Sequence, residues 1–315
     1  MSKTVLIALG GNAISPKNIA GTVKEQFAHT RESLKGIMHF INRDYKIGIT
    51  HGNGPQVGDE LQRNEFSSNE IPPLPLGVLV ANTQGAIGYM IQQSLLNTLH
   101  KHNIEREVVS FISQVRVDSD DSALKNPTKY VGRRYSTKDA IKFQKELGWK
   151  MKEQEPEEWR RVVPSPTPKY LFNGHSIKNL IDFGTIVIAS GGGGIPCYFD
   201  KDGSLEGIDG VIDKDMSAAL LGRILKADEL FIVTDVDNIY INFKEINQKP
   251  LIHASVSEIE KLLIEGHFKR GTMEPKIRAA LYFLKYHGKK VVITSINCIE
   301  GAIKGTQGTT IRNDK

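Results

Sequence analysis

The chain has 315 residues, of which 39% are hydrophobic and 24% are charged, and it contains 29 glycines. This composition is typical of a globular protein with many tight turns. No segment approaches the roughly 18 apolar residues that a membrane span needs, and the short run VLIAL near the start is followed at once by a turn. We therefore interpret that run as a first strand and expect neither a signal peptide nor a membrane partner.

The net charge of +5 suits anionic small molecules as well as nucleic acid. No arginine-rich tail or interleaved aromatic and basic stretch favours nucleic acid, so we expect no nucleic-acid partner. Cys197 and Cys298 are far apart and have no Cys-X-X-Cys or Cys/His spacing. They are expected to be buried thiols, and together these features predict a cytoplasmic protein with no zinc site.

Five apolar runs rich in Val, Ile and Leu each stop at small or polar residues, and they predict buried strands of a parallel sheet. They occupy residues 4–13, 45–55, 184–196, 229–238 and 289–298. Helical stretches alternate with them at residues 24–42, 82–102, 216–226, 256–265 and 275–287. This alternation predicts an α/β fold, a three-layer αβα sandwich around a mainly parallel sheet.

The strand ends carry glycine-rich or polar turns, and ligands of open parallel sheets bind at the carboxyl ends of the strands. Glycines there let the backbone approach a ligand, and free N–H groups at helix starts bind anions. The candidate residues are Gly10, Gly11, Asn12, Gly52, Asn53, Gly54, Gly191, Gly192, Thr234 and Asp235. Each turn could need glycine for structure alone, but four such turns on one edge favour a binding site.

Residues 116–172 interrupt the strand–helix alternation, being charged, dotted with proline and poor in apolar runs. They predict a small inserted subdomain over about residues 118–168, with a hairpin and a helix near 137–147. This composition fits a lid that closes over the substrate, and it fits equally a solvent-exposed insertion with no role at the site.

The segment VIDKDMSAAL places Asp213, Lys214 and Asp215 where a strand passes into a helix. An aspartate there can cap the helix, whereas a lysine opposes the positive end of the helix dipole. Lys276 repeats the pattern beside Pro275, a residue suited to a first helical turn. Two lysines at two helix starts suggest a shared phosphate, and phosphoryl transfer depends on positioning and charge neutralisation.

Other chemistries lack support in the sequence. GNGPQVG has the wrong glycine spacing for a dinucleotide fold and no ribose-binding carboxylate follows it, which argues against an oxidoreductase. No Walker A, G-X-S-X-G, HEXXH or EF-hand motif is present.

A series of motifs then occurs in order along the chain: ALGGNA, HGNGPQVG, QGAIGYMIQQ, NPTKYVG, WRRVVPSPTP, IASGGGGIP, VIDKDMSAALL, TDVD and GTMEPK. Together they resemble the carbamate kinases of the amino acid kinase family over nearly the whole chain. HGNGPQVG with WRRVVPSP is specific to that group, whereas GGNA and Asp-Lys-Asp occur across the wider family. The chain is similar to that group throughout.

The resemblance implies reversible phosphoryl transfer from carbamoyl phosphate to ADP, giving ATP and carbamate, with Mg2+ and a homodimer. It also implies a role in arginine metabolism. The catalytic residues would be Lys129, Lys214, Asp215 and Lys276, with Asp215 holding Lys214 and Lys276 in position. The carbamoyl group would bind at Gly10, Gly11, Asn12, Gly52, Asn53 and Gly54. The nucleotide would bind at Gly191, Gly192, Asp213, Thr234, Asp235, Met273 and Pro275, and no protein residue is expected to be a dedicated metal ligand.

By this resemblance residues 1–315 form one amino acid kinase domain, with a carbamate-side lobe at 1–182 and a nucleotide-side lobe at 183–315. The chain departs from the usual residues at Thr83, Asn238 and Thr272. A kinase of another acid or phosphate with the same fold, and a catalytically silent ligand-binding relative, stay open as alternatives. Because carbamate is already an anionic nucleophile, no general base is required, and His51 is expected to be structural.

Overall fold

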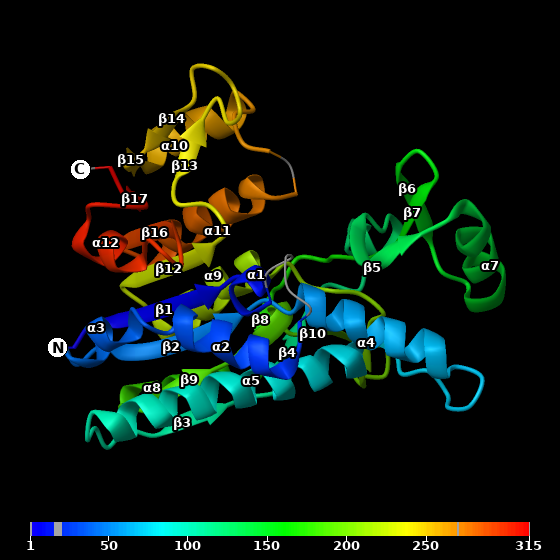
Figure 1. Cartoon of the computed structure of the whole chain (residues 1–315), viewed down its shortest axis with the longest axis horizontal. Coiled ribbons are helices and arrows are strands. Elements are labelled where there is room, and N and C mark those ends of the chain that lie inside the picture. The colour runs from blue at the N-terminus through cyan, green and yellow to red at the C-terminus, as the bar shows by residue number, and fades with distance from the viewer. Residues whose placement is uncertain (1, 16–20, 270, 315) are drawn as a thin grey trace.

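The computed structural model describes residues 2–15, 21–269 and 271–314, without the side chains of residues 12 and 13. Its centre is an eight-stranded sheet with helices on both faces (Figure 1). In spatial order the strands are β15 (His253–Ser255), β17 (Thr309–Arg312), β16 (Lys290–Ser295), β12 (Glu229–Thr234), β1 (Thr4–Leu9), β2 (Lys46–His51), β9 (Ile186–Ile188) and β3 (Val108–Ser110). The strands from β16 to β3 are mutually parallel, and β17 is antiparallel to β16.

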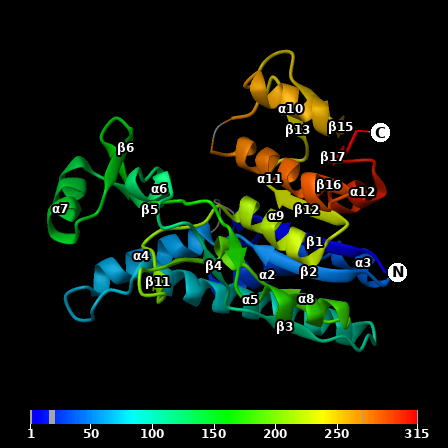
Figure 2. The ribbon, with the colours of Figure 1, turned by 180° about the vertical axis from the view of Figure 1, so that it is seen from behind.

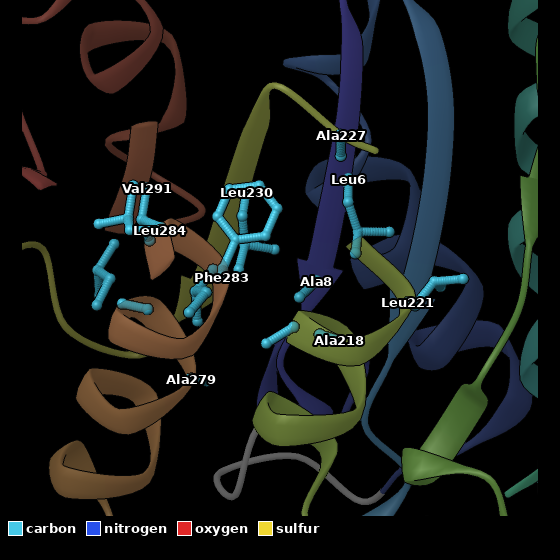
Figure 3. Close-up of a cluster of buried hydrophobic side chains, with 14 of the residues drawn as sticks. Leu6, Ala8, Ala218, Leu221, Ala227, Leu230, Ala279, Phe283, Leu284 and Val291 are labelled. Atoms are coloured by element: carbon cyan, nitrogen blue, oxygen red, sulfur yellow. The ribbon is translucent and has the colours of Figure 1, made fainter. Parts of the chain in front are cut away.

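Alternate residues of the central strands bury against two helical layers, as the period of two in a strand requires. On β1, Leu6 and Ala8 pack with α8 (Gly174–Asp182), α9 (Lys214–Leu225), α10 (Val256–Ile264) and α11 (Met273–Tyr286). Figure 3 shows part of this cluster between β1, α9 and α11. Val5, Ile7 and Leu9 face the other layer, formed by α3 (Ile37–Ile41), α5 (Leu76–Lys101) and α12 (Ile299–Lys304). The structure therefore confirms the three-layer sandwich.

The five predicted strands are all present, while several predicted helices differ in their bounds. The stretch 24–42 is two helices, α2 (Val23–Ser33) and α3, with a turn at Gly36. A Cβ at Gly36 would lie 2.9 Å from Cγ2 of Ile299, so close packing against α12 explains the glycine there. Helix α5 begins at Leu76, earlier than expected, directly after Pro75.

Some elements have no counterpart among the predicted ones. They are the short strands β3, β15 and β17, and the helices α1 (Gly11–Ile14), α4 (Gly54–Ser67), α8 and α12. A second sheet has the order β11 (Leu205–Gly207), β10 (Ile195–Phe199), β4 (Gln114–Arg116) and β8 (Tyr170–Leu171). A hairpin pairs β13 (Ile239–Ile241) with β14 (Lys249–Leu251). Most of these strands have two to four residues, which is too little pattern to distinguish a strand from a loop by sequence.

The inserted segment protrudes from the main body (Figures 1 and 2). It contains α6 (Ser122–Lys125), α7 (Thr137–Leu147) and a three-stranded sheet in the order β5 (Lys129–Tyr135), β7 (Glu158–Val163), β6 (Met151–Glu155). The predicted helix at 137–147 and the hairpin are confirmed. Val131 and Val163 pack against Val57 and Leu61 of α4, so an apolar contact joins the base of the subdomain to the core.

One continuous sheet crosses the predicted division between residues 182 and 183, because β1 pairs with both β2 and β12. The division into two functional lobes stays a prediction. Among the described residues, none of the helices has the length and apolar character needed to cross a membrane.

Candidate active site

A cleft of about 1060 Å³ lies at the carboxyl ends of the parallel strands. Its walls come from segments far apart in the chain: the turns after β1, β2 and β12, the starts of α9 and α11, and the strands β5 and β7 of the inserted subdomain. This is where ligands of open α/β sheets bind. The sheet therefore brings the predicted glycine-rich turns and lysines to one cleft.

The carboxylate of Asp215 bridges two lysines at the base of the cleft. Lys214 Nζ donates to Asp215 Oδ1 at 2.9 Å, and Lys276 Nζ donates to Asp215 Oδ2 at 3.2 Å. Asp215 is only 3% exposed. Lys276 also donates to the carbonyl oxygen of Thr272 at 3.4 Å. The two lysines are thereby aimed at one place although they stand at the starts of different helices.

The start of α9 explains how Lys214 is placed. Asp213 is the N-cap residue, and its Oδ1 accepts hydrogen bonds from the backbone N–H groups of Asp215 and Met216 at 3.0 and 3.2 Å. This cap satisfies two of the N–H groups that a helix start leaves unpaired. Asp213 also binds the third predicted lysine, because Lys129 Nζ donates to its Oδ2 at 3.1 Å. Lys129 thus reaches the cleft from the inserted subdomain.

The two lysines that share Asp215 differ in their electrostatics. Burial opposes the charge on Lys214, but the carboxylate of Asp215 outweighs it and raises the pKa of Lys214. Burial and the neighbouring Lys214 ammonium lower the pKa of Lys276. Although burial acts against ionisation of Asp215, the two ammoniums lower its pKa to about 2. One carboxylate serves two ammoniums, so the group has an excess of positive charge that an anion would offset.

The glycine turns bring backbone close to the lysines. A Cβ at Gly52 would lie 2.7 Å from the backbone nitrogen of Gly11 and 3.0 Å from Cδ of Lys214. A Cβ at Gly10 would lie 2.9 Å from the carbonyl oxygen of Val233. Real Cβ atoms do not approach other atoms this closely, so glycine lets β1, β2 and the Lys214 side chain converge.

Nearly all of the predicted site residues line the cleft. They are Gly10, Gly11, Gly52, Asn53, Gly54, Lys129, Gly192, Asp213, Lys214, Asp215, Thr234, Asp235, Met273, Pro275 and Lys276. Gly191 is not among the lining residues, and a Cβ there would meet Nε2 of His51 at 2.3 Å. The backbone of Asn12 belongs to α1, but its side chain lies outside the described residues. The individual roles of these residues stay predictions.

Several other residues that line the cleft were not predicted from the sequence. They include Tyr130 and Arg160 of the subdomain, Tyr240 and Phe243 at and after β13, and His267 and Phe268 after α10. The aromatic residues have no local signal, because any apolar position could bury them. Arg160 belongs to the WRRVVPSP motif, which could have identified it.

Contacts near Asn53 explain how Thr83 can replace the usual serine and why His51 has a structural role. Asn53 Nδ2 donates to Thr83 Oγ1 at 2.9 Å, so Thr83 supplies the hydroxyl that serine would. His51 is buried, and burial lowers its pKa to about 4. Its Nδ1 lies 3.1 Å from the carbonyl oxygen of Gly52, so the neutral ring donates a hydrogen bond from that nitrogen. These contacts fit the structural role expected for His51.

The structure also shows the surroundings of Thr272 and Asn238, the other two positions at which the chain differs from the usual family residues. Thr272 is the N-cap residue of α11 but makes no side-chain cap hydrogen bond. The backbone of Asn238 is not left-handed, since Asn238 is absent from the residues with positive φ. Asn238 is 9% exposed and lines the cleft.

Comparison with known proteins identifies the class to which this fold and site belong. The model of the amino acid kinase family matches residues 3–295. Carbamate kinase from Pyrococcus horikoshii is 44% identical over 313 residues, which cover 99% of each chain. Carbamate kinase 2 from Staphylococcus epidermidis is 44% identical over 316 residues, covering 99% of this chain and 100% of its own. The chain therefore belongs to the amino acid kinase family.

Solved structures agree with this assignment. Carbamate kinase from Giardia lamblia bound to AMP-PNP superposes with a TM-score of 0.92 and 39% identity, covering 99% of both chains. Within the amino acid kinase family, the chain belongs to the group formed by the carbamate kinases.

Proposed function

We propose that this enzyme catalyses reversible phosphoryl transfer between ATP and carbamate. The observation that carries the proposal is the bridge from Asp215 to Lys214 and Lys276, two ammoniums held 2.9 and 3.2 Å from one buried carboxylate. They stand beside backbone turns that can bind anions. Full-length similarity to carbamate kinases supplies the identity of the acceptor.

The chemistry of the reaction matches these residues. A carbamate oxygen attacks the γ-phosphorus of ATP, a new P–O bond forms, and the bond to ADP breaks with its electron pair leaving on the ADP oxygen. No proton moves, so no general base is needed. The main difficulty is bringing two anions together, and Lys214 and Lys276 would neutralise charge on the moving group. Orientation at the turns of Gly10, Gly11, Gly52 and Asn53 would supply much of the remaining rate enhancement.

The second half of the cleft fits the nucleotide. Thr234, Asp235, Met273 and Pro275 line it together with Tyr240 and Phe243, which offer apolar surface for a base. In the Giardia lamblia relative, the ligand is AMP-PNP. We assign these residues to ATP and ADP.

We also propose that Mg2+ binds with the nucleotide and neutralises phosphate charge. Among the described residues, no group of three or more His, Cys, Asp or Glu side chains could hold a metal ion. Mg2+ needs few protein ligands, because it commonly uses one or two carboxylates while substrate phosphates and water fill its other positions. Asp235, which lines the cleft and raises the pKa of Lys214, is the carboxylate that we propose for this role, although the sequence alone predicted no metal ligand in the protein.

One coupled assay tests the proposal. ATP formation from ADP and carbamoyl phosphate is measured with Mg2+, beside acetyl phosphate as the alternative donor. We expect rapid ATP formation with carbamoyl phosphate and little with acetyl phosphate. Equal rates would indicate a less selective acid kinase, and no ATP from either donor would indicate a silent ligand-binding relative.

We further propose a cytoplasmic homodimer. The edge strand β3 pairs with β9 and with no other described strand, and an unpaired edge is open to pairing with a second chain. Tyr89, Leu96 and Ile112, on α5 and just after β3, are 57%, 43% and 48% exposed. Both cysteines are free and buried, which suits a reducing compartment. Light scattering after size-exclusion chromatography is expected to give twice the mass of one chain, and replacing Ile112 by Glu should produce monomers.

A further inference from the structure

The inserted subdomain contains four arginines, and three of them are neutralised by carboxylates. Arg133 pairs with Glu65, Arg134 with Glu158, and Arg161 with Asp209. Among the described residues, Arg160 has no ion-pair partner. It is also the arginine of the four that lines the cleft.

The contacts of Arg160 hold it in place without using most of its donors. Its Nη2 donates to the carbonyl oxygen of Gly132 at 2.8 Å, and its guanidinium carbon lies 5.6 Å from the ring centre of Tyr130. Its Nε is buried and has no hydrogen-bond partner among the described residues. Burial, with Arg134 nearby, lowers the pKa of Arg160, but a guanidinium stays protonated in proteins.

A half-buried cation without a counter-charge is unfavourable, and an anionic ligand in the same cleft would supply that charge. Arg160 shares the cleft with Lys129, Lys214 and Lys276. A planar guanidinium matches two oxygens of one phosphoryl group, which a lysine does not. The transferred phosphoryl group is the anion that both directions of the proposed reaction bring between these cations.

We propose that Arg160 is a further substrate-binding residue, which donates to oxygens of the transferred phosphoryl group from the side of the inserted subdomain. This assignment rests on the proposed function. It gives the subdomain a definite task, because Arg160 and Lys129 would both come from it, on the neighbouring strands β7 and β5.

The test compares two nucleotides that differ by the γ-phosphoryl group. Dissociation constants of AMP-PNP and ADP are measured by calorimetry with Mg2+ for wild type, Arg160→Gln and Arg160→Lys. The matched control is Arg134→Gln, which removes a neighbouring arginine of the same sheet whose partner, Glu158, is at the surface. Circular dichroism spectra and urea midpoints show whether each variant is folded.

We expect Arg160→Gln to weaken AMP-PNP binding by about 10- to 100-fold and to leave ADP binding unchanged. The kcat of Arg160→Gln should fall by about 10²- to 10³-fold. AMP-PNP affinity and kcat of Arg160→Lys should lie between those of wild type and Arg160→Gln, and Arg134→Gln should match wild type in both. An equal effect on both nucleotides, or no effect on either, would overturn the assignment and leave Arg160 a structural residue of β7. If wild type bound neither nucleotide, the proposed function would fail as well. Failure of the carbamate assay alone would not alter the nucleotide comparison.

Discussion

Replacing Asp215 by Asn provides the sharpest test of the site. The substitution keeps the shape of the side chain and removes the charge that Lys214 and Lys276 share. The ammonium groups of Lys214 and Lys276 would then repel each other, without a carboxylate between them to offset their charges. We expect the variant to lose both stability and activity.

The magnitude follows from the geometry. The difference between the ordinary pKa of 3.8 and the folded-state value of about 2 corresponds to about 2 kcal/mol of stability at neutral pH. Removing one member of a buried ion pair leaves the partner uncompensated and costs about 3–5 kcal/mol. We therefore expect the free energy of unfolding to fall by about 2–5 kcal/mol at pH 7, with kcat reduced by orders of magnitude.

Urea unfolding at pH 7 and at pH 3 measures the effect. Because the pKa of Asp215 is lowered in the folded state, its stabilisation is present above pH 3.8 and is lost as the pH falls through about 2. The difference between wild type and Asp215→Asn should therefore be smaller at pH 3. A matched control is Asp182→Asn, since Asp182 also pairs with two lysines, Lys46 and Lys178, but is 39% exposed.

Asp182→Asn should cost less than about 1 kcal/mol, as exposed pairs do. If Asp215→Asn were as stable as Asp182→Asn at pH 7, or if its deficit did not shrink on acidification, the argument from a shared buried carboxylate would be wrong.

Three further predictions concern the lysines and the glycine turn. Lys214→Ala or Lys276→Ala should lower kcat by orders of magnitude while the circular dichroism spectrum stays that of the folded protein; near-normal turnover in either variant would contradict their roles. Because the pKa of Lys276 is lowered from 10.5, kcat/KM should decline on the alkaline side below the pH expected for an ordinary lysine, and Lys276→Arg should remove that decline. Gly52→Ala should destabilise the protein by about 1–3 kcal/mol and reduce kcat, because its Cβ would strike Gly11 and Lys214. Gly54→Ala is its control, since nothing lies within 4 Å of the Cβ that it adds, and equal behaviour of the two alanine variants in urea unfolding would refute the packing argument.

Local sequence patterns were sufficient for the main elements of the fold. A continuous apolar run predicts a strand buried on both faces, and β1, β2, β9, β12 and β16 all follow from such runs. The helix start at Asp213 was likewise predictable, because an N-cap aspartate acts on backbone N–H groups two and three residues away. Parallel strands place their carboxyl ends on one edge, so the position of the cleft followed as well.

Contacts between distant segments had no local signal. The break between α2 and α3 depends on how closely Gly36 approaches Ile299. The helical periodicity of the sequence gives no information about that distance. The Asp215–Lys276 bridge joins residues 61 positions apart, and the Lys129–Asp213 pair joins residues 84 positions apart. The resemblance to a family predicted that these residues act together, whereas their geometry depends on the path of the chain.

The sequence alone determined an αβα fold, a ligand edge and lysines that oppose their own helix dipoles, because each of these arises from interactions over a few residues. Only the tertiary structure decided the geometry by which the buried carboxylate of Asp215 serves two of those lysines, a role that the sequence predicted through the family resemblance alone. It also decided that Arg160, unlike Arg133, Arg134 and Arg161, enters the cleft without an acidic partner among the described residues. The physical reason is that charge pairing depends on distances of a few ångströms between side chains, which only the folded chain brings together.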